Sequence, residues 1–148
     1  MPSRLFVSDL DGTLLQRNGR LSDYAVAGLE ALTKKGIPFT VASGRSFASI
    51  RHALEPLQLQ LPIISSDGAL ISSFDDPAPL HLFSMDVDPL DELVAFLRNE
   101  GFHPVLDQWT GTANVSVGAP PQNPVEHWYH DFKCLEPYYQ WDHAPNGQ

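Results

Sequence analysis

Cysteine, basic residues and long apolar runs are all scarce in this sequence of 148 residues. Its one cysteine, Cys134, excludes an internal disulfide and fits a reducing cytoplasm, which is the location we expect. No stretch approaches the ~18 consecutive apolar residues of a membrane span. Lys and Arg number 9 against 18 Asp and Glu, a formal charge of −9. That deficit of basic residues argues against nucleic acid and against an anionic membrane as partners.

Near its N-terminus the chain contains an apolar run that ends in two acidic residues. Residues 5–15 read LFVSDLDGTLL, so Asp9 and Asp11 are followed directly by a Gly-Thr turn. In a strand these two side chains would project the same way. At a strand end of a parallel sheet they would lie where ligands of open α/β folds bind. Two oxygen ligands so close suit Mg²⁺, which usually takes one or two carboxylates together with substrate phosphate.

The first half of the chain alternates predicted strands and helices. Asn18-Gly19 predicts a hairpin turn, which we interpret as a small flap over the carboxylates. Ser22 is a good helix N-cap, and Gly36 suits the position after that helix. This order predicts right-handed crossovers and an α/β fold, a Rossmann-like core with a parallel sheet. The expected elements are strands at 4–8, 37–42 and 62–65, helices at 22–35 and 46–54, and a further apolar run at 69–73.

The second half predicts a smaller α/β unit. Asp88 is the expected N-cap of its first helix, with Pro89 at the first helical position. We therefore expect a core domain at residues 1–82 and a partial α/β cap with an irregular C-terminal tail at 83–148. The expected elements are a strand at 80–85, a helix from 88 to 100, strands at 103–107 and 112–117, and a helix at 125–134.

Three strand ends of the expected core carry polar residues that fit phosphate chemistry. Neighbouring parallel strands place these ends side by side. The first strand end contributes two carboxylates, the second a hydroxyl and a guanidinium, and the third an acidic turn. Phosphoryl transfer needs such a nucleophile, a metal site and donors for the phosphoryl oxygens. The residues are Asp9 and Asp11, Ser43-Gly44-Arg45, and Ser66-Asp67-Gly68.

This arrangement resembles the haloacid dehalogenase-like superfamily of Mg²⁺-dependent phosphatases, and most of all its Cof-type sugar-phosphate phosphatases with a large α/β cap. Residues 9–13 match the DxDGT motif of that superfamily. Ser43, in the sequence SGR at 43–45, matches its second motif, a Ser or Thr at a strand end. The sequence SDGALI at 66–71 is similar to the NGA loop of the Cof-type group, with Asp67 where Asn is usual.

The resemblance implies catalysis through an aspartyl-phosphate intermediate. Asp9 would be the nucleophile, and Asp11 the general acid for the leaving alcohol and then the base for water. Mg²⁺ would bind to Asp9 and to the backbone carbonyl of Asp11. The implied substrate is a small phosphorylated metabolite of the sugar-phosphate class. The residues implied in phosphate or substrate binding are Thr13, Ser43, Gly44, Arg45, Asp67 and Gly68.

Beyond residue 118 the sequence departs from the Cof-type pattern. Members of that group return from the cap to the core with a lysine motif and an acidic GDxxND motif, and neither follows here. We therefore expect the N-terminal part of a longer protein or a truncated gene product, weak or inactive alone. The strands that pair beside residues 5–8 in that group are missing as well, which predicts an apolar sheet edge that invites self-association.

Other interpretations fit parts of the pattern. A non-catalytic remnant would bind phosphate or a partner through the same loops. A receiver-like phospho-acceptor also has acidic residues at strand ends, but the flap and the cap-like unit argue against it. His127 and His130 could share a helix face and bind a metal, although an aromatic-rich surface helix is the simpler interpretation. The aromatic residues that could stack on a sugar, or belong to the cap core, are Trp109, Trp128, Tyr138, Tyr139 and Trp141.

Overall fold

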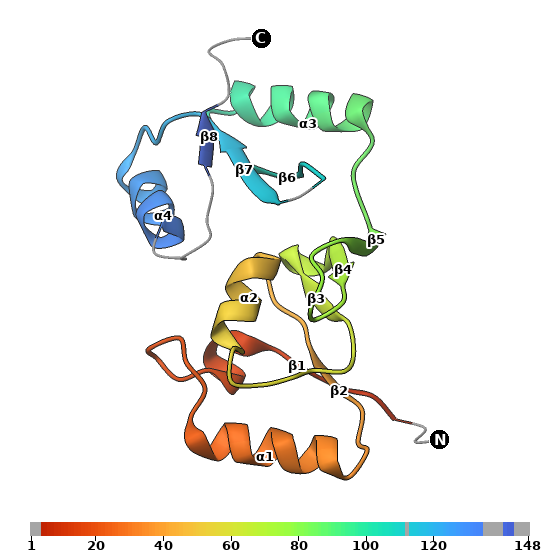
Figure 1. Cartoon of the computed structure of the whole chain (residues 1–148). Helices are drawn as coiled ribbons and strands as arrows, with labels where there is room; N and C mark the ends of the chain where they lie inside the picture. The colour runs from red at the N-terminus through yellow and green to blue at the C-terminus, as the bar shows by residue number, and fades with distance from the viewer. Residues whose placement is uncertain (1–3, 112, 135–140, 144–148) are drawn as a thin grey trace. The chain divides into compact units, whose positions relative to one another are not determined.

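The chain folds into two compact units, Met1–Phe83 and Ser84–Gln148 (Figure 1). The computed structural model describes residues 4–111, 113–134 and 141–143. The predicted domain boundary after residue 82 lies one residue before the division between the units. No helix in the described ranges is long and apolar enough to cross a membrane.

Unit 1 alternates short strands with helices, as the sequence predicted. Ser22 caps the first helix and accepts a hydrogen bond from the Ala25 backbone N–H at 3.1 Å. Gly36, at φ 67°, follows the end of that helix in the left-handed conformation that glycine favours. The elements are β1 (Phe6–Ser8), α1 (Asp23–Lys34), β2 (Phe39–Val41), α2 (Phe47–Ala53), β3 (Ile63–Ser65), β4 (Leu70–Ser72) and β5 (Pro79–Leu82).

The parallel sheet predicted for unit 1 is confirmed for its first pair of strands and is interrupted after them. β1 and β2 are parallel, with Phe6 opposite Phe39 and Ser8 opposite Val41. β2 lies next to β3 through an isolated parallel bridge between Ala42 and Ile64, and the Thr40 hydroxyl donates to the Pro62 carbonyl just before β3. β3, β4 and β5 instead form an antiparallel sheet. The predicted parallel arrangement is therefore present in β1, β2 and the bridge to β3, and β3 continues into an antiparallel sheet because the chain turns back within a few residues after it.

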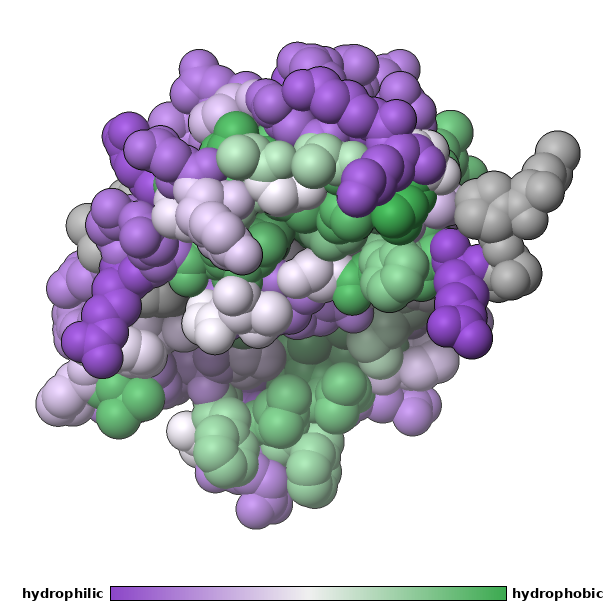
Figure 2. Space-filling model, turned by 90° about the horizontal axis from the view of Figure 1, so that it is seen from below, coloured by the Kyte–Doolittle hydropathy of each residue, from purple (hydrophilic) through white to green (hydrophobic). Residues whose placement is uncertain are grey.

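The edge of unit 1 is apolar and open to solvent at β1. Leu5, Phe6 and Val7 are 56%, 53% and 47% exposed, although all three are large hydrophobic residues. Figure 2, which looks at the molecule from below, shows hydrophobic surface beside strongly hydrophilic surface. Exposed apolar strands at a sheet edge are ready to pair with a further strand. The predicted apolar edge at residues 5–8 is thus present in the structure.

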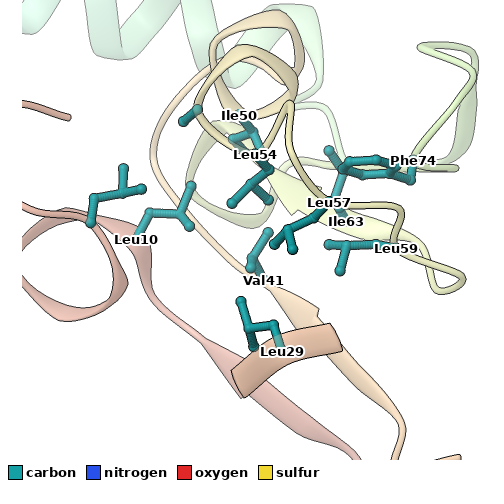
Figure 3. Close-up of a cluster of buried hydrophobic side chains, with 11 residues drawn as sticks. Leu10, Leu29, Val41, Ile50, Leu54, Leu57, Leu59, Ile63 and Phe74 are labelled. Atoms are coloured by element: carbon teal, nitrogen blue, oxygen red, sulfur yellow. The ribbon is translucent and has the colours of Figure 1, made fainter. Parts of the chain in front are cut away.

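The core of unit 1 lies around β2. Val41 is fully buried and lies between Leu29 of α1 on one side and, on the other, Ile50 of α2 and Leu54 directly after that helix (Figure 3). Leu10, from the loop after β1, belongs to the same cluster and is also fully buried. Burial of a leucine or isoleucine side chain stabilises a fold by about 1.5–3 kcal/mol. This packing therefore fixes the loop after β1 against β2 and α2.

The described part of unit 2 contains two helices and a small sheet. β6 and β7 pair in antiparallel fashion, with Leu106 opposite Val117, and β8 joins β7 in parallel. The structure corrects the sequence prediction in three places. The first helix begins after Asp86 instead of Asp88, and β6 lies later than the strand expected at 103–107. In addition, the strand β8 lies in the tail that was expected to be irregular. The elements are α3 (Val87–Asn99), β6 (Leu106–Trp109), β7 (Asn114–Gly118), α4 (Pro124–Cys134) and β8 (Trp141–His143).

The start of α4 is held by a group of hydrogen bonds that were not predicted from the sequence. Asn123 Oδ1 accepts bonds from the backbone N–H groups of Val125 and Glu126 at 3.1 and 3.0 Å. Glu126 in turn accepts from the Gln122 backbone N–H and lies 2.8 Å from His103 Nδ1. These contacts, led by the Gln122 backbone bond, hold the pKa of Glu126 below its ordinary value of 4.5.

Candidate active site

The loop after β1 presents two carboxylates to solvent. β1 ends at Ser8, so Asp9 and Asp11 lie in the loop and not within a strand. Leu10 between them is fully buried, whereas both aspartates are exposed. Gly12, at φ 73°, allows the chain to turn, and the Leu15 backbone N–H closes the loop onto the Leu10 carbonyl at 2.8 Å.

Asp9 lies directly after the end of β1 and has a hydroxyl neighbour within the same loop. The Thr13 hydroxyl donates a hydrogen bond to Asp9 Oδ2 at 3.3 Å. Because Thr13 is four residues further along the chain, this contact depends on the turn at Gly12. The structure thus brings together the predicted nucleophile and the threonine expected to support its loop.

Asp11 is engaged by a residue from the next strand end. Arg45 Nε donates to Asp11 Oδ2 and Arg45 Nη2 donates to Asp11 Oδ1, both at 2.7 Å. The pair is therefore bidentate, the geometry in which a guanidinium binds a carboxylate most strongly. The Arg45 side chain is 22% exposed and the Asp11 side chain 56%. Arg45 was predicted from the sequence to bind the substrate, and the structure places it against Asp11.

Ser43 is buried at the end of β2, with 8% of its surface exposed. Its backbone N–H donates to the Ile64 carbonyl at 3.0 Å, which joins the strand end to β3. Its hydroxyl oxygen accepts a bond from the Arg45 backbone N–H at 3.3 Å. Ser43 therefore shapes the turn from which Arg45 reaches Asp11.

The third predicted loop lies against the second. A Cβ atom at Gly44 would lie 2.6 Å from Asp67 Oδ1, so a larger residue here would displace the exposed Asp67 carboxylate. The Ser66 backbone N–H donates to the Arg45 carbonyl at 2.9 Å. Ser66 and Asp67 have φ values of 50° and 54°, in the left-handed region that side chains rarely adopt. This backbone turn, continued by Gly68 at φ 95°, brings Asp67 back over Gly44.

The predicted flap closes next to the same arginine. The Gln16 backbone N–H donates to the Arg20 carbonyl at 2.9 Å, and Gly19 lies at its tip with φ 74°. A Cβ at Gly19 would lie 3.9 Å from Arg45 Nη2. The flap is therefore a neighbour of the Arg45–Asp11 pair.

A residue that was not predicted from the sequence also contacts this pair. Ser49, on α2, is 1% exposed, and its hydroxyl oxygen accepts a bond from Arg45 Nη1 at 3.3 Å. Its separation of four residues from Arg45, at the start of a predicted helix, was the signal that could have identified it.

The donor set at this edge fits a hard divalent cation only in part. The Asp9 carboxylate and the Asp11 backbone carbonyl are the predicted metal ligands, while both oxygens of the Asp11 carboxylate are bound by Arg45. Mg²⁺ usually keeps several waters and takes one or two carboxylates besides substrate phosphate, so a set this small is compatible with it. In the part of the chain that the structure describes, no three or more His, Cys, Asp or Glu side chains gather as a metal site.

The weaker candidate residues lie apart from this edge in the sequence. His130 Nδ1 is 3.7 Å from Asp131 Oδ1. Trp128 on α4 is 66% exposed, while Trp109 is half-buried in β6. Tyr138 and Tyr139 lie outside the described residues. A shared sugar-binding surface of these aromatic residues therefore stays a prediction.

Known proteins of similar sequence match part of this chain. A relative from Mycoplasma genitalium is 42% identical over 86 residues, which are 58% of this chain and 31% of that protein. The HMP-PP phosphatase of Enterobacter sp. (strain 638) is 36% identical over 89 residues, 60% of this chain and 32% of that enzyme. The matched segment thus spans about a third of the length of these relatives.

Solved structures give the same fold. A haloacid dehalogenase-like hydrolase from B. subtilis superposes with a TM-score of 0.72 at 20% identity, covering 95% of this chain and 53% of that one. The subclass IIB sugar phosphatase BT4131 gives a TM-score of 0.68 at 22% identity, covering 94% and 52%. Residues 6–140 match the family profile of haloacid dehalogenase-like hydrolases. The chain therefore belongs to the haloacid dehalogenase-like hydrolases.

Proposed function

We propose that this chain carries the nucleophile and part of the substrate site of a Mg²⁺-dependent phosphatase. The observation that carries the proposal is the loop after β1, in which buried Leu10 leaves Asp9 and Asp11 exposed on one loop. An exposed carboxylate at a strand end is open to an incoming phosphate ester. The Thr13 hydroxyl bond at 3.3 Å holds one of its oxygens in place.

In the proposed reaction an Asp9 oxygen attacks the phosphorus of a phosphate monoester, and the bond from phosphorus to the leaving alcohol oxygen breaks. Asp11 gives a proton to that oxygen and later takes one from the water that hydrolyses the aspartyl-phosphate. This division into two displacements is the usual gain from a carboxylate nucleophile. A bound Mg²⁺ would supply charge neutralisation for the phosphoryl oxygens, held by Asp9 and the Asp11 carbonyl.

Binding of the phosphate group is assigned to the strand ends that follow β2 and β3. Ser43, Gly44 and Arg45 form one turn, and Asp67 with Gly68 forms the turn that lies against it. The proposed substrate is a small phosphorylated metabolite. Two of the proteins compared above support this class, because the Enterobacter relative is named a phosphatase and BT4131 a sugar phosphatase.

A specific observation also favours the second candidate, a phosphate- or partner-binding role without turnover. Both Asp11 oxygens are bound by Arg45, so neither of them is open to a leaving group. In that case the loops would bind phosphate, but the proton transfer assigned to Asp11 would be slow or absent.

Phosphate release separates the two candidates. The 148-residue chain is incubated with p-nitrophenyl phosphate in the presence of Mg²⁺ and, in parallel, with excess EDTA. Release that depends on Mg²⁺ supports the phosphatase. A folded chain that releases no phosphate but shifts the ³¹P resonance of inorganic phosphate supports the binding role, and a folded chain that does neither contradicts both.

We further propose that the open edge of β1 pairs with a second copy of this chain. Leu5, Phe6 and Val7 are all about half exposed, and the backbone of β1 is paired with β2 on one side. Pairing would cover this apolar strand, which is otherwise an aggregation hazard. A cytoplasmic location stays a prediction that rests on the single cysteine.

A further inference from the structure

Ser49 is a buried polar residue whose hydroxyl has no part in the fold of its own helix. It lies in α2 and is 1% exposed. Its backbone N–H donates to Ser46 Oγ at 3.3 Å, which is the N-cap bond of α2. An alanine at this position would keep that bond, since only the backbone of Ser49 is involved. The hydroxyl oxygen instead accepts from Arg45 Nη1 at 3.3 Å.

The Arg45 guanidinium has three nitrogen atoms, and the one that is not bonded to Asp11, Nη1, donates to Ser49. Nε and Nη2 point to the two Asp11 oxygens, and Nη1 points to Ser49. A guanidinium is planar, so holding one nitrogen fixes the direction of the other two. Buried Ser49 is anchored in a helix, whereas Asp11 lies in an exposed loop. Of the two residues that bind the guanidinium, Ser49 is therefore the more rigidly held.

We propose that Ser49 is a positioning residue that aims Arg45 at Asp11. It acts through Arg45 and touches neither the proposed nucleophile nor the residue assigned to proton transfer. The effect on turnover rests on the proposed phosphatase function, whereas the effect on Arg45 does not. The two can therefore be tested separately.

The test compares Ser49→Ala and Ser49→Cys with the unchanged chain. Alanine removes the hydroxyl acceptor and cysteine replaces it with a larger, weakly accepting sulfur, so a role in positioning predicts that both variants behave alike. A role in packing alone predicts that the two variants differ, because alanine leaves a void and the larger cysteine overfills the site. Ser72→Ala is the matched control, because Ser72 is also buried and bonds the Pro77 carbonyl at 3.2 Å in a different part of unit 1.

The first readout is the exchange of the Arg45 Nε proton with water, followed by ¹⁵N NMR and assigned through its loss in Arg45→Lys. Removal of one hydrogen bond predicts that exchange accelerates roughly threefold to tenfold in both Ser49 variants. The Ser72→Ala control should exchange at the rate of the unchanged chain. Equal rates in the Ser49 variants and the control would overturn the proposal.

The second readout is the kinetics of p-nitrophenyl phosphate hydrolysis. Because Arg45 is also assigned to phosphate binding, the positioning role predicts a kcat/KM lower by a similar factor in Ser49→Ala and Ser49→Cys. If the unchanged chain does not hydrolyse the substrate, the phosphatase proposal fails and the exchange measurement still decides the role of Ser49. If it hydrolyses the substrate and exchange is unaltered in the variants, the role of Ser49 fails alone.

Discussion

Arg45 and Asp11 form a bidentate ion pair, with Nε–Oδ2 and Nη2–Oδ1 distances of 2.7 Å. The two residues are 34 positions apart and come from the loops after β2 and β1. An exposed ion pair contributes only about 0–1 kcal/mol to stability. The main effect of this pair is therefore to fix the position of the Asp11 carboxylate, and not to stabilise the fold. Asp11 can transfer a proton only when one of its oxygens is open to the leaving group.

Asp9→Asn tests the nucleophile. The amide keeps the size of the side chain but is a poor nucleophile, so Mg²⁺-dependent phosphate release should fall by roughly a thousandfold or more. Because Asp9 is exposed, the far-UV circular dichroism should stay the same. The measurement is phosphate release from p-nitrophenyl phosphate. Activity in the variant equal to that of the unchanged chain would remove Asp9 from this role.

Arg45→Lys tests the bidentate pair. Lysine keeps the positive charge and loses the planar fork, so it cannot bind both Asp11 oxygens at once. Arg45 is also assigned to phosphate binding, and bonds to charged groups are worth about 1.5–3 kcal/mol, so loss of the fork predicts a loss of kcat/KM of roughly tenfold to a hundredfold. The free energy of unfolding in urea should change by less than about 1 kcal/mol. Arg98→Lys on α3 is the control and should keep full activity; an Arg45→Lys variant as active as this control would contradict the prediction.

Gly44→Ala tests the contact between the second and third loops. The new Cβ would meet Asp67 Oδ1 at 2.6 Å, closer than real Cβ atoms approach other atoms. The Asp67 side chain must therefore move, and we expect lower phosphate affinity in ³¹P NMR titration. Gly28→Ala is the matched control, since nothing lies within 4 Å of a Cβ there and Gly28 is inside α1. That control should gain about 0.5–1 kcal/mol in stability. A Gly44→Ala variant that binds phosphate as the unchanged chain does would show that Asp67 does not constrain this loop.

Glu126→Gln tests the pH dependence of unit 2. The folded-state pKa of Glu126 lies below its ordinary value of 4.5, chiefly through the Gln122 backbone bond. Between the folded and unfolded pKa values the unfolded chain binds more protons, so the stabilisation is present above this window and is lost as the pH falls through it. Urea unfolding followed by tryptophan fluorescence at about pH 7 and about pH 3 should therefore show a smaller pH effect in Glu126→Gln. Glu92→Gln, on exposed α3, is the control; an equal pH effect in both variants would contradict this role of Glu126.

Val7→Lys tests self-association through β1. A lysine on an exposed edge strand opposes pairing with another strand. Light scattering at tens of micromolar should show a dimer or larger species for the unchanged chain and a monomer for the variant. Tyr24→Lys serves as the control, because Tyr24 is 89% exposed on α1 and away from the edge. A folded monomer of the unchanged chain at that concentration would end this proposal.

Local features of the fold were predictable because they depend on residues within one or two turns of one another. Ser22 accepts a bond from a residue three positions later, and Gly36 follows the end of α1. The start of α3 was placed two residues late, since Asp86 and Asp88 are both acceptable at a helix start. β8 was missed because its pairing partner, β7, lies more than twenty residues earlier, and a strand this short has no periodic signal of its own.

The sequence by itself determined that two aspartates follow a strand, that a Gly-Thr turn comes after them, and that a serine and an arginine end the next strand. These facts are properties of adjacent residues. Only the tertiary structure decided which groups meet: Arg45 with Asp11, Asp67 against Gly44, and Ser49 behind Arg45. The physical reason is that each of these contacts depends on strand register, on the left-handed turn at Ser66 and Asp67, and on burial of Leu10 and Val41 in a common core, which no local pattern encodes.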